Sequence, residues 1–124
     1  ALASSLSAGC KYCQAHTSHG AEKAGIDQLK IAEILNYKDS ELYADDEKAV
    51  LDLAFAAGQI PNGSSTEHFT ELKKHFSDDV ITDIVSVISI FGFLNRWNDT
   101  LGTVLEDIPK GFVEDKLKPL GWNK

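Results

Sequence analysis

The sequence predicts an all-α fold, a helical bundle of about six helices, on three observations. Apolar residues recur at spacings of three and four along most of the chain, the period of a helix that buries one face. Capping residues and glycines separate these stretches at the distances typical of short helices. Alternation of apolar and polar residues, which would indicate a strand, never continues beyond four residues.

The first half of the chain predicts four helices. Gly9 and Gly25 follow the first two and favour the left-handed conformation that ends a helix. Asp27 caps the third, and acidic residues fill the first turn of the fourth, where the helix dipole favours negative charge. The predicted helices cover residues 1–8, 10–24, 27–35 and 44–57, with a polar linker over 36–43.

The second half predicts two more helices and a tail. A turn at Pro61-Asn62-Gly63 precedes a helix that Ser65 or Thr66 caps. The longest helix begins at Ser77–Asp79 and runs to about Leu101. After it, prolines and glycines at 109, 111, 119 and 121 predict an irregular tail with one short helix.

We expect a single helical domain over residues 1–105 and a C-terminal tail over 106–124. At 124 residues the chain suffices for one ordinary domain and can bury about two-thirds of its unfolded surface. The chain contains no Met, and Leu2 and Leu6 already lie at helical spacing. Its start therefore looks like the middle of a helix, and we expect an upstream segment to be missing.

Composition and charge exclude several classes of function. The net charge is −7 and no basic cluster is present, which argues against a nucleic-acid partner. The longest apolar run, 84–94, is interrupted by Ser86, Ser89 and Gly92, and falls short of the ~20 residues of a membrane helix. We therefore expect no membrane partner and no signal peptide.

The predicted helix from Asp78 to Leu101 is apolar on nearly every side between Val80 and Leu94. Such a helix is either the centre of a bundle or part of a subunit interface. The short helices of this chain offer little surface to cover all its faces. We therefore expect a homo-oligomer with this helix in the interface, and a monomeric bundle around a central helix as the alternative.

Cys10 and Cys13, the only cysteines of the chain, form a CxxC motif followed by His16 and His19. On a helix, residues three apart point ~60° from each other and lie roughly 5–6 Å apart. A reversible disulfide is therefore geometrically allowed. A close CxxC in an otherwise cysteine-free chain is typical of a reducible pair in a reducing compartment, so we expect a cytoplasmic protein. Two buried thiols that merely fill space are the alternative.

Other uses of this motif fit less well. The pattern C-x2-C-x2-H-x2-H contains four zinc ligands by type. On one helix, however, they fan across ~180° and do not close a tetrahedron. Haem attachment requires a histidine at position 14, which is Gln. A thioredoxin fold would place the motif after a strand. We expect no metal and no organic cofactor.

His16 lies three residues after Cys13 on the same predicted helix face. An imidazole there is placed to take the thiol proton and to stabilise the reactive thiolate. His19 turns further away, and ordinary packing is an equal interpretation for it. Which thiol is the nucleophile stays open at this point, because the helix N-terminus favours a thiolate at Cys10 and His16 favours one at Cys13.

Two segments, CKYCQAHTSHGAEKAG and the later FGFLNRWNDTLG with Asn95, Arg96 and Asp99, resemble the alkylhydroperoxidase D / carboxymuconolactone decarboxylase superfamily, in its peroxidase-related branch. The resemblance spans about residues 1–105. It implies an all-helical fold that assembles into trimers or hexamers. It also implies a thiol-dependent peroxidase that reduces hydroperoxides and is itself reduced by an external dithiol.

The resemblance assigns roles to three residues. Cys13 would be the peroxidatic cysteine, Cys10 the resolving one, and His16 part of a proton relay. The family's histidine usually falls one position later, at Thr17 here, and its relay glutamate lies upstream of the CxxC, where residues 1–9 contain no acid. The alternatives are a non-catalytic redox-sensing or structural oligomer and a carboxymuconolactone decarboxylase-like lyase, although members with lyase activity typically lack the CxxC.

Overall fold

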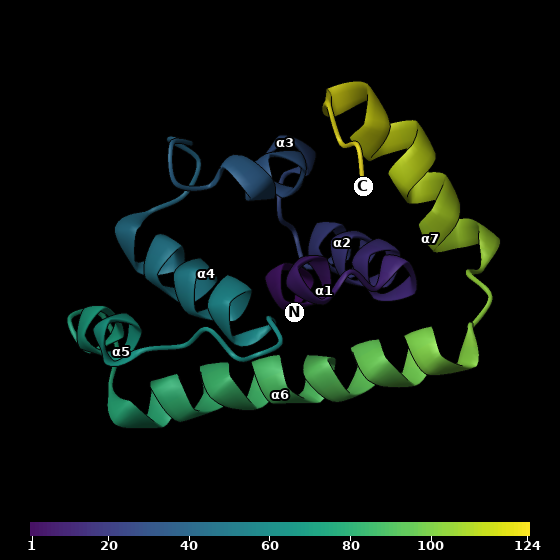
Figure 1. Cartoon of the computed structure of the whole chain (residues 1–124). Helices are drawn as coiled ribbons and strands as arrows, with labels where there is room; N and C mark the ends of the chain where they lie inside the picture. Colours follow the sequence, from purple (N-terminus) through teal and green to yellow (C-terminus); the bar gives the residue numbers. More distant parts are fainter.

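The structure, a computed structural model, describes residues 1–124 and is entirely helical (Figure 1). The α-helices are α1 (Leu2–Ala8), α2 (Lys11–Lys23), α3 (Gln28–Ala32), α4 (Asp45–Ala57), α5 (Thr66–Leu72), α6 (Asp78–Leu101) and α7 (Asp107–Phe112). Three short helical turns extend them: η1 (Glu33–Asn36), η2 (Val113–Leu117) and η3 (Lys118–Leu120). The predicted all-α fold is confirmed.

The predicted caps end the helices where the sequence indicated. Gly9 and Gly25, predicted to end the first two helices, adopt positive φ values of 79° and 93°, as does Gly102 after α6 at 61°, and residues with a side chain rarely adopt such values. The Asp27 carboxylate accepts a hydrogen bond from the Leu29 N–H at 2.9 Å and begins α3. Helix α5 begins after Ser65, one of the two predicted caps, and ends at Leu72.

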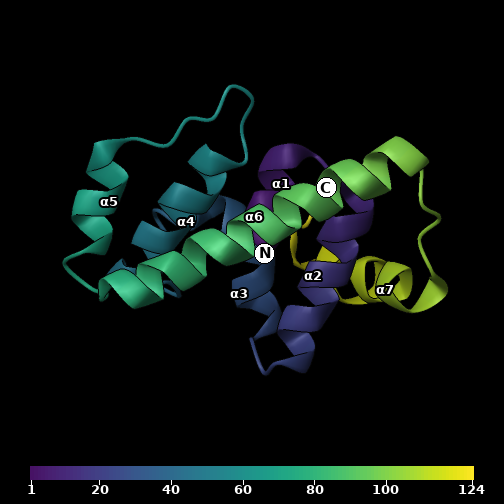
Figure 2. The same cartoon turned by 90° about the horizontal axis from the view of Figure 1, so that it is seen from below.

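Helices α1 and α2 lie at the centre of the molecule, and the others surround them (Figures 1 and 2). Helix α1 packs against α2, α4 and α6, and α2 packs against α6 and α7. The hydrophobic core joins residues from α1, α3, α4, α5, α6 and the C-terminal segment, with Leu53, Leu72 and Leu117 almost wholly buried. The CxxC helix is therefore held from several sides.

The C-terminal segment is more regular than its prolines and glycines predicted. Residues 107–120 are helical almost throughout. Phe112, Leu117 and Trp122 belong to the same buried cluster as the core residues of α1 and α4. The division of the chain at residue 105 remains a prediction, but the segment beyond it packs directly on α2 and α3.

Helix α6 runs along the lower edge of the molecule in Figure 1 and crosses in front of the other helices in Figure 2. Only Ile81, Ile88 and Asn95 of its 24 residues are buried. It is therefore not the centre of a monomeric bundle. Its outer face carries large exposed apolar side chains: Val80, Val85, Val87, Ile90, Phe93, Trp97 and Leu101.

By length and composition alone, α6 is long and apolar enough to cross a membrane, although only 17% of its most apolar window is buried. The sequence predicted no such segment, because Ser86, Ser89 and Gly92 interrupt the apolar run. In the helix both hydroxyls donate to the carbonyl four residues earlier, at 2.8 Å each. Because carbonyl groups of the helix accept hydrogen bonds from both hydroxyls, these serines do not prevent α6 from having the length and composition of a membrane-spanning helix.

Candidate redox site

Cys10 occupies the N-cap of α2, at the sharp reversal between α1 and α2. The left-handed Gly9 turns the chain, and the Cys10 N–H donates to the Ser5 carbonyl at 3.1 Å. The Cys10 sulfur then accepts a hydrogen bond from the Cys13 N–H at 3.3 Å. Cys10 has no exposed surface. The sequence therefore folds locally so that one thiol caps the helix that carries the other.

Cys13 lies in the first turn of α2 and is 4% exposed. Its sulfur is 3.6 Å from Nδ2 of Asn98, which also donates to the Leu94 carbonyl at 2.9 Å. An amide N–H directed at a sulfur stabilises negative charge there. Both cysteines are free thiols in this structure. The prediction that they lie at the start of one helix is confirmed.

Three polar residues of α6 face this end of α2. Asn95 is 2% exposed and donates to the Ser5 hydroxyl at 3.0 Å, which ties α6 to α1. Asn98 contacts Cys13, and Asp99 is one of the groups that raise the pKa of the Cys10 thiol. Residues at spacings of three and four share one face of a helix. In the C-terminal half of α6, Asn95 is therefore buried and Asn98 half-buried, whereas Asp99, Phe93 and Trp97 are exposed.

The environment of Cys10 holds its proton. Burial, and after it the hydrogen bond with the Cys13 thiol, raises the pKa of Cys10 to about 12. The Asp99 carboxylate acts in the same direction. Burial of Cys10 therefore outweighs the effect of the helix N-terminus, which by itself would favour a thiolate at this residue.

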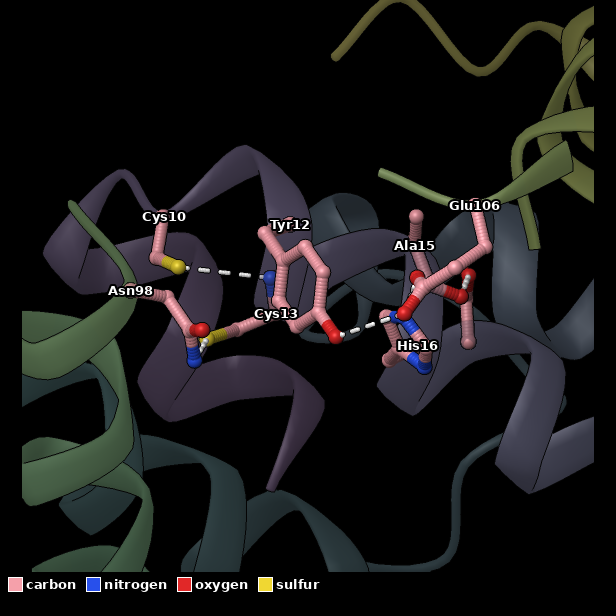
Figure 3. A network of polar contacts seen from close by, with 8 residues as sticks. Cys10, Tyr12, Cys13, Ala15, His16, Asn98 and Glu106 are labelled. Atoms are coloured by element: carbon pink, nitrogen blue, oxygen red, sulfur yellow. Dashed lines mark hydrogen bonds and ion pairs between the residues drawn. The ribbon is translucent and has the colours of Figure 1, made fainter. Parts of the chain in front are cut away.

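His16 does not hydrogen-bond to either sulfur. Its Nε2 lies 2.7 Å from Oε2 of Glu106, and the Tyr12 hydroxyl donates to Oε1 of Glu106 at 3.1 Å. The rings of Tyr12 and His16 pack with centroids 4.3 Å apart. In Figure 3 the two cysteines and Asn98 form one cluster, and His16 and Glu106 form a second one along α2.

The structure thus brings Cys10 and Cys13 together and places His16 a short distance along the same helix. His19 packs against Phe112, with ring centroids 5.3 Å apart. Sequence reasoning missed Asn98 and Glu106. Asn98 stood inside the FGFLNRWNDTLG segment, but Glu106 contacts a residue 90 positions earlier, and no local pattern signals such a contact.

A cavity of about 750 Å³ opens between α1, α6 and the segment after α4, and neither cysteine lines it. Its wall includes Ser4, Asn95, Arg96 and Asp99. Ser4 Oγ and Asn95 Oδ1 are buried there without a hydrogen-bond partner. Asp99 belongs both to this wall and to the groups that raise the pKa of Cys10, so a small molecule in the cavity would lie next to that residue.

Comparison with solved structures finds close likenesses. The debrominase Bmp8 without ligand is 35% identical, with a TM-score of 0.86 over 93% of this chain and 62% of that one. A cysteine-to-alanine variant of Bmp8 in complex with 2,3,4-tribromopyrrole is 34% identical, with a TM-score of 0.87 and the same coverage. The chain therefore spans under two-thirds of the length of the debrominase.

Two more distant relatives complete the comparison. A protein of unknown function from Agrobacterium tumefaciens, with a suggested antioxidant-defence role as AhpD, is 24% identical with a TM-score of 0.79 over 85% of this chain and 73% of its own. The uncharacterised protein YnjA of Escherichia coli (strain K12) is 28% identical over 101 residues, 81% of this chain and 52% of that protein. No family model matches the chain. The structural likenesses show the alkylhydroperoxidase D-like fold.

Proposed function

We propose that this member of the alkylhydroperoxidase D-like fold superfamily is a dithiol reductase in which Cys10 and Cys13 cycle between two thiols and a disulfide, with a hydroperoxide as substrate. The observation that carries the proposal is the arrangement of the two thiols at the start of α2. One caps the helix that bears the other, and the Cys13 N–H bonds the Cys10 sulfur at 3.3 Å. Two thiols so placed supply two electrons without a further cofactor.

In the proposed reaction the Cys13 thiolate attacks the O–O bond of the hydroperoxide. That bond breaks, the sulfur becomes a sulfenic acid, and the alcohol leaves with a proton. The Cys10 sulfur then attacks the sulfenic sulfur, so that an S–S bond forms, the S–O bond breaks and water leaves. An external dithiol reduces the disulfide by exchange and is itself oxidised.

The division of labour between the thiols is supported by their environments. The raised pKa of Cys10, caused first by burial, keeps it a thiol at neutral pH, whereas the Asn98 amide near Cys13 favours negative charge on that sulfur. Cys13 is then the attacking group. The hydrogen bond between the thiols also contributes to the raised pKa of Cys10, and it is lost once Cys13 is oxidised. The Asp99 carboxylate is the nearby group that would take the Cys10 proton.

Reductive debromination is a second candidate, favoured by the 35% identity with Bmp8 over 93% of this chain. In that reaction a C–Br bond is replaced by a C–H bond and bromide is released. Two thiols become one disulfide and supply the two electrons. The same CxxC pair would serve both reactions, and the substrate alone differs.

Parallel assays distinguish the candidates. Reduced protein with excess dithiothreitol is given cumene hydroperoxide in one reaction and 2,3,4-tribromopyrrole in another, and peroxide loss and bromide release are followed. Peptide mass spectrometry without reductant should show a Cys10–Cys13 link after a single turnover. Peroxide loss supports the first candidate, and bromide release without peroxide loss supports the second.

Other outcomes contradict both. Disulfide formation without turnover would identify a redox sensor, and conversion of a carboxymuconolactone without disulfide formation would identify a lyase. Free thiols after peroxide treatment would remove the redox role altogether.

We further propose a cytoplasmic protein that assembles as a homotrimer or homohexamer, in line with the exposed apolar face of α6.

A further inference from the structure

The side-chain amide of Asn98 lies against the Cys13 sulfur with its nitrogen end. Nδ2 is 3.6 Å from Sγ of Cys13 and 2.9 Å from the Leu94 carbonyl oxygen, to which it donates. The two N–H groups of the amide thus have one acceptor each. The bond to Leu94 fixes which end of the amide is nitrogen, because a carbonyl oxygen at that distance requires a donor. Figure 3 shows the end of the Asn98 side chain beside the Cys13 sulfur.

The oxygen end of the same amide has no partner in the protein. Oδ1 of Asn98 accepts no hydrogen bond from any residue, and unlike Oδ1 of Asn95 it is not sealed from solvent. Asn98 is half-buried, whereas Cys13 beside it is 4% exposed. The structure therefore leaves a free and accessible acceptor at the edge of the thiol cluster, next to the sulfur to which the proposed function gives the attack.

The chemistry of a hydroperoxide supplies the donor that this acceptor lacks. A hydroperoxide has a single O–H, on its terminal oxygen, and this is the oxygen that a thiolate attacks to give a sulfenic acid. A peroxide with alkyl groups on both oxygens has no donor at all. A site that holds a hydrogen-bond acceptor for a substrate O–H rejects analogues without one, because the acceptor is then left unpaired.

We propose that Asn98 is a substrate-binding residue that selects hydroperoxides: its Oδ1 accepts the O–H of the terminal oxygen while its Nδ2 holds the Cys13 thiolate. The two ends of one planar amide then hold the two atoms that become bonded, which favours their reaction. The S–O bond forms, the O–O bond breaks, and the alkoxide leaves and takes a proton from water. The O–H bond persists, so Oδ1 next holds the hydroxyl of the sulfenic acid. The inference rests on the proposed function, since it assigns a residue to that reaction.

Two substitutions of Asn98 separate the two ends of the amide. Asn98→Ala removes both ends, whereas Asn98→Asp removes the N–H donors and keeps an acceptor oxygen. Asn36→Ala, at an exposed asparagine of η1, is the matched control. For each reduced full chain, the rate of Cys13 oxidation by cumene hydroperoxide is divided by the rate of its modification by methyl methanethiosulfonate. The second reagent has no O–H or N–H, so the ratio cancels a change in the amount of thiolate.

We expect Asn98→Ala to lower this ratio about three- to tenfold, the effect of losing one ordinary hydrogen bond. Asn98→Asp should keep the ratio near its wild-type value although both rates fall, because a carboxylate beside the sulfur disfavours the thiolate. Asn36→Ala should change neither rate. An unchanged ratio in Asn98→Ala, or an equal fall of the ratio in Asn98→Asp, would overturn the inference.

A second measurement requires no reaction with a peroxide. Neophyl alcohol has the shape of cumene hydroperoxide, with a methylene group in place of the inner oxygen, and it keeps the terminal O–H that its methyl ether lacks. Protection of Cys13 from methyl methanethiosulfonate measures the binding of each compound. The alcohol should bind wild-type protein about three- to tenfold more tightly than the ether, and the two should bind Asn98→Ala equally. Equal binding to the wild type, or protection by neither compound, would contradict the assignment.

Together the two measurements distinguish the role of Asn98 from the proposed function. Stronger protection by the alcohol in a protein that consumes no hydroperoxide would refute the proposed function and leave the acceptor role of Asn98 standing. Turnover of hydroperoxide with an unchanged ratio in Asn98→Ala, and with no preference for the alcohol, would have the opposite meaning.

Discussion

The N-terminal end of α2 and the outer face of α6 distribute polarity in opposite ways. At the end of α2, two thiols and the polar side chains of Ser5 and Gln14 are buried at 5% exposure or less. On α6, Ile90, Phe93 and Trp97 are each more than half exposed. The chain thus buries chemically reactive groups where polar partners satisfy them, and it leaves large apolar groups at the surface.

This difference indicates two kinds of constraint. Buried polar groups are retained when hydrogen bonds satisfy them, as the N–H of Cys13 and the amide of Asn98 do for the sulfurs. Exposed aromatic residues on one helix face lose roughly 1.5–3 kcal/mol each relative to burial, so they indicate a surface that is covered in the working assembly. The first region carries the proposed redox chemistry, and the second predicts association.

The largest expected effect comes from replacing either of the two cysteines. Cys13→Ser should abolish reduction of the substrate, because the attacking sulfur is gone. Cys10→Ser should complete one attack and then stop at the sulfenic acid, since no second thiol resolves it. Stopped-flow loss of hydroperoxide, with dimedone trapping of the sulfenic acid, measures both.

The assignment of roles would be reversed if Cys10→Ser were already inactive at the first attack while Cys13→Ser reacted once. Steady turnover by both variants with dithiothreitol would show that neither thiol is required. Ser is the suitable replacement at position 10 because it also caps a helix N-terminus.

Whether a feature of the fold or the site could be predicted from the sequence depends on how far apart in the chain the contacting residues lie. The helix boundaries at Gly9, Asp27, Ser77 and Gly102 follow from local capping chemistry, and all of them were predicted within a residue or so. The pairing of Cys10 with Cys13 follows from helical spacing alone. These predictions need only neighbours a few positions apart.

Contacts between distant segments could not be predicted. Glu106 reaches His16 because α7 docks on α2, and one sequence does not encode that docking in any local pattern. The exposure of α6 was also missed in part: periodicity showed apolar residues on every side, but only the packing reveals that Ile81 and Ile88 face inward while Phe93 faces out.

The second prediction tests the α6 face. Phe93→Glu should convert the expected trimer or hexamer to a monomer of 13.6 kDa, because a charge placed in an apolar interface is left without a partner. Light scattering at micromolar concentration measures the mass. Leu35→Glu is the matched control, since Leu35 is also exposed at 45% but lies on η1, across the molecule from α6 (Figure 1).

A monomeric wild-type protein would refute the subunit interface. Binding of the wild-type protein to neutral lipid vesicles, lost in Phe93→Glu, would instead indicate that the face of α6 meets a membrane, for which its length and composition suffice.

The third prediction concerns the packing of α1, which carries the chain to Cys10. A methyl group on Gly58 would lie 2.7 Å from Cβ of Ser7 and 3.2 Å from the Ser4 carbonyl oxygen. Gly58→Ala should therefore destabilise the protein by about 1–3 kcal/mol, as overpacking usually does. Gly20→Ala, on α2 with no atom within 4 Å of the added methyl group, should stabilise it by about 1 kcal/mol through helix propensity. Urea unfolding of both variants measures the difference, and an unchanged midpoint for Gly58→Ala would show that α1 and α4 separate easily.

The smallest expected effect is a dependence of stability on alkaline pH that comes from Cys10. Its ordinary pKa is 9.0, and burial raises the folded value to about 12. Below pH 9 the thiol is protonated in both the folded and the unfolded chain, so its contribution is fully present. Above pH 9 the unfolded chain loses this proton first, so the contribution is lost as the pH rises toward 12.

Reduced wild-type protein should therefore lose more stability between pH 8 and pH 10.5 than Cys10→Ser, which has no thiol to titrate there. Urea unfolding in the presence of a phosphine reductant measures the two slopes. Parallel slopes would mean that the Cys10 thiol ionises as readily in the folded protein as in the unfolded chain. Its position at the N-terminal end of α2 would then not raise its pKa.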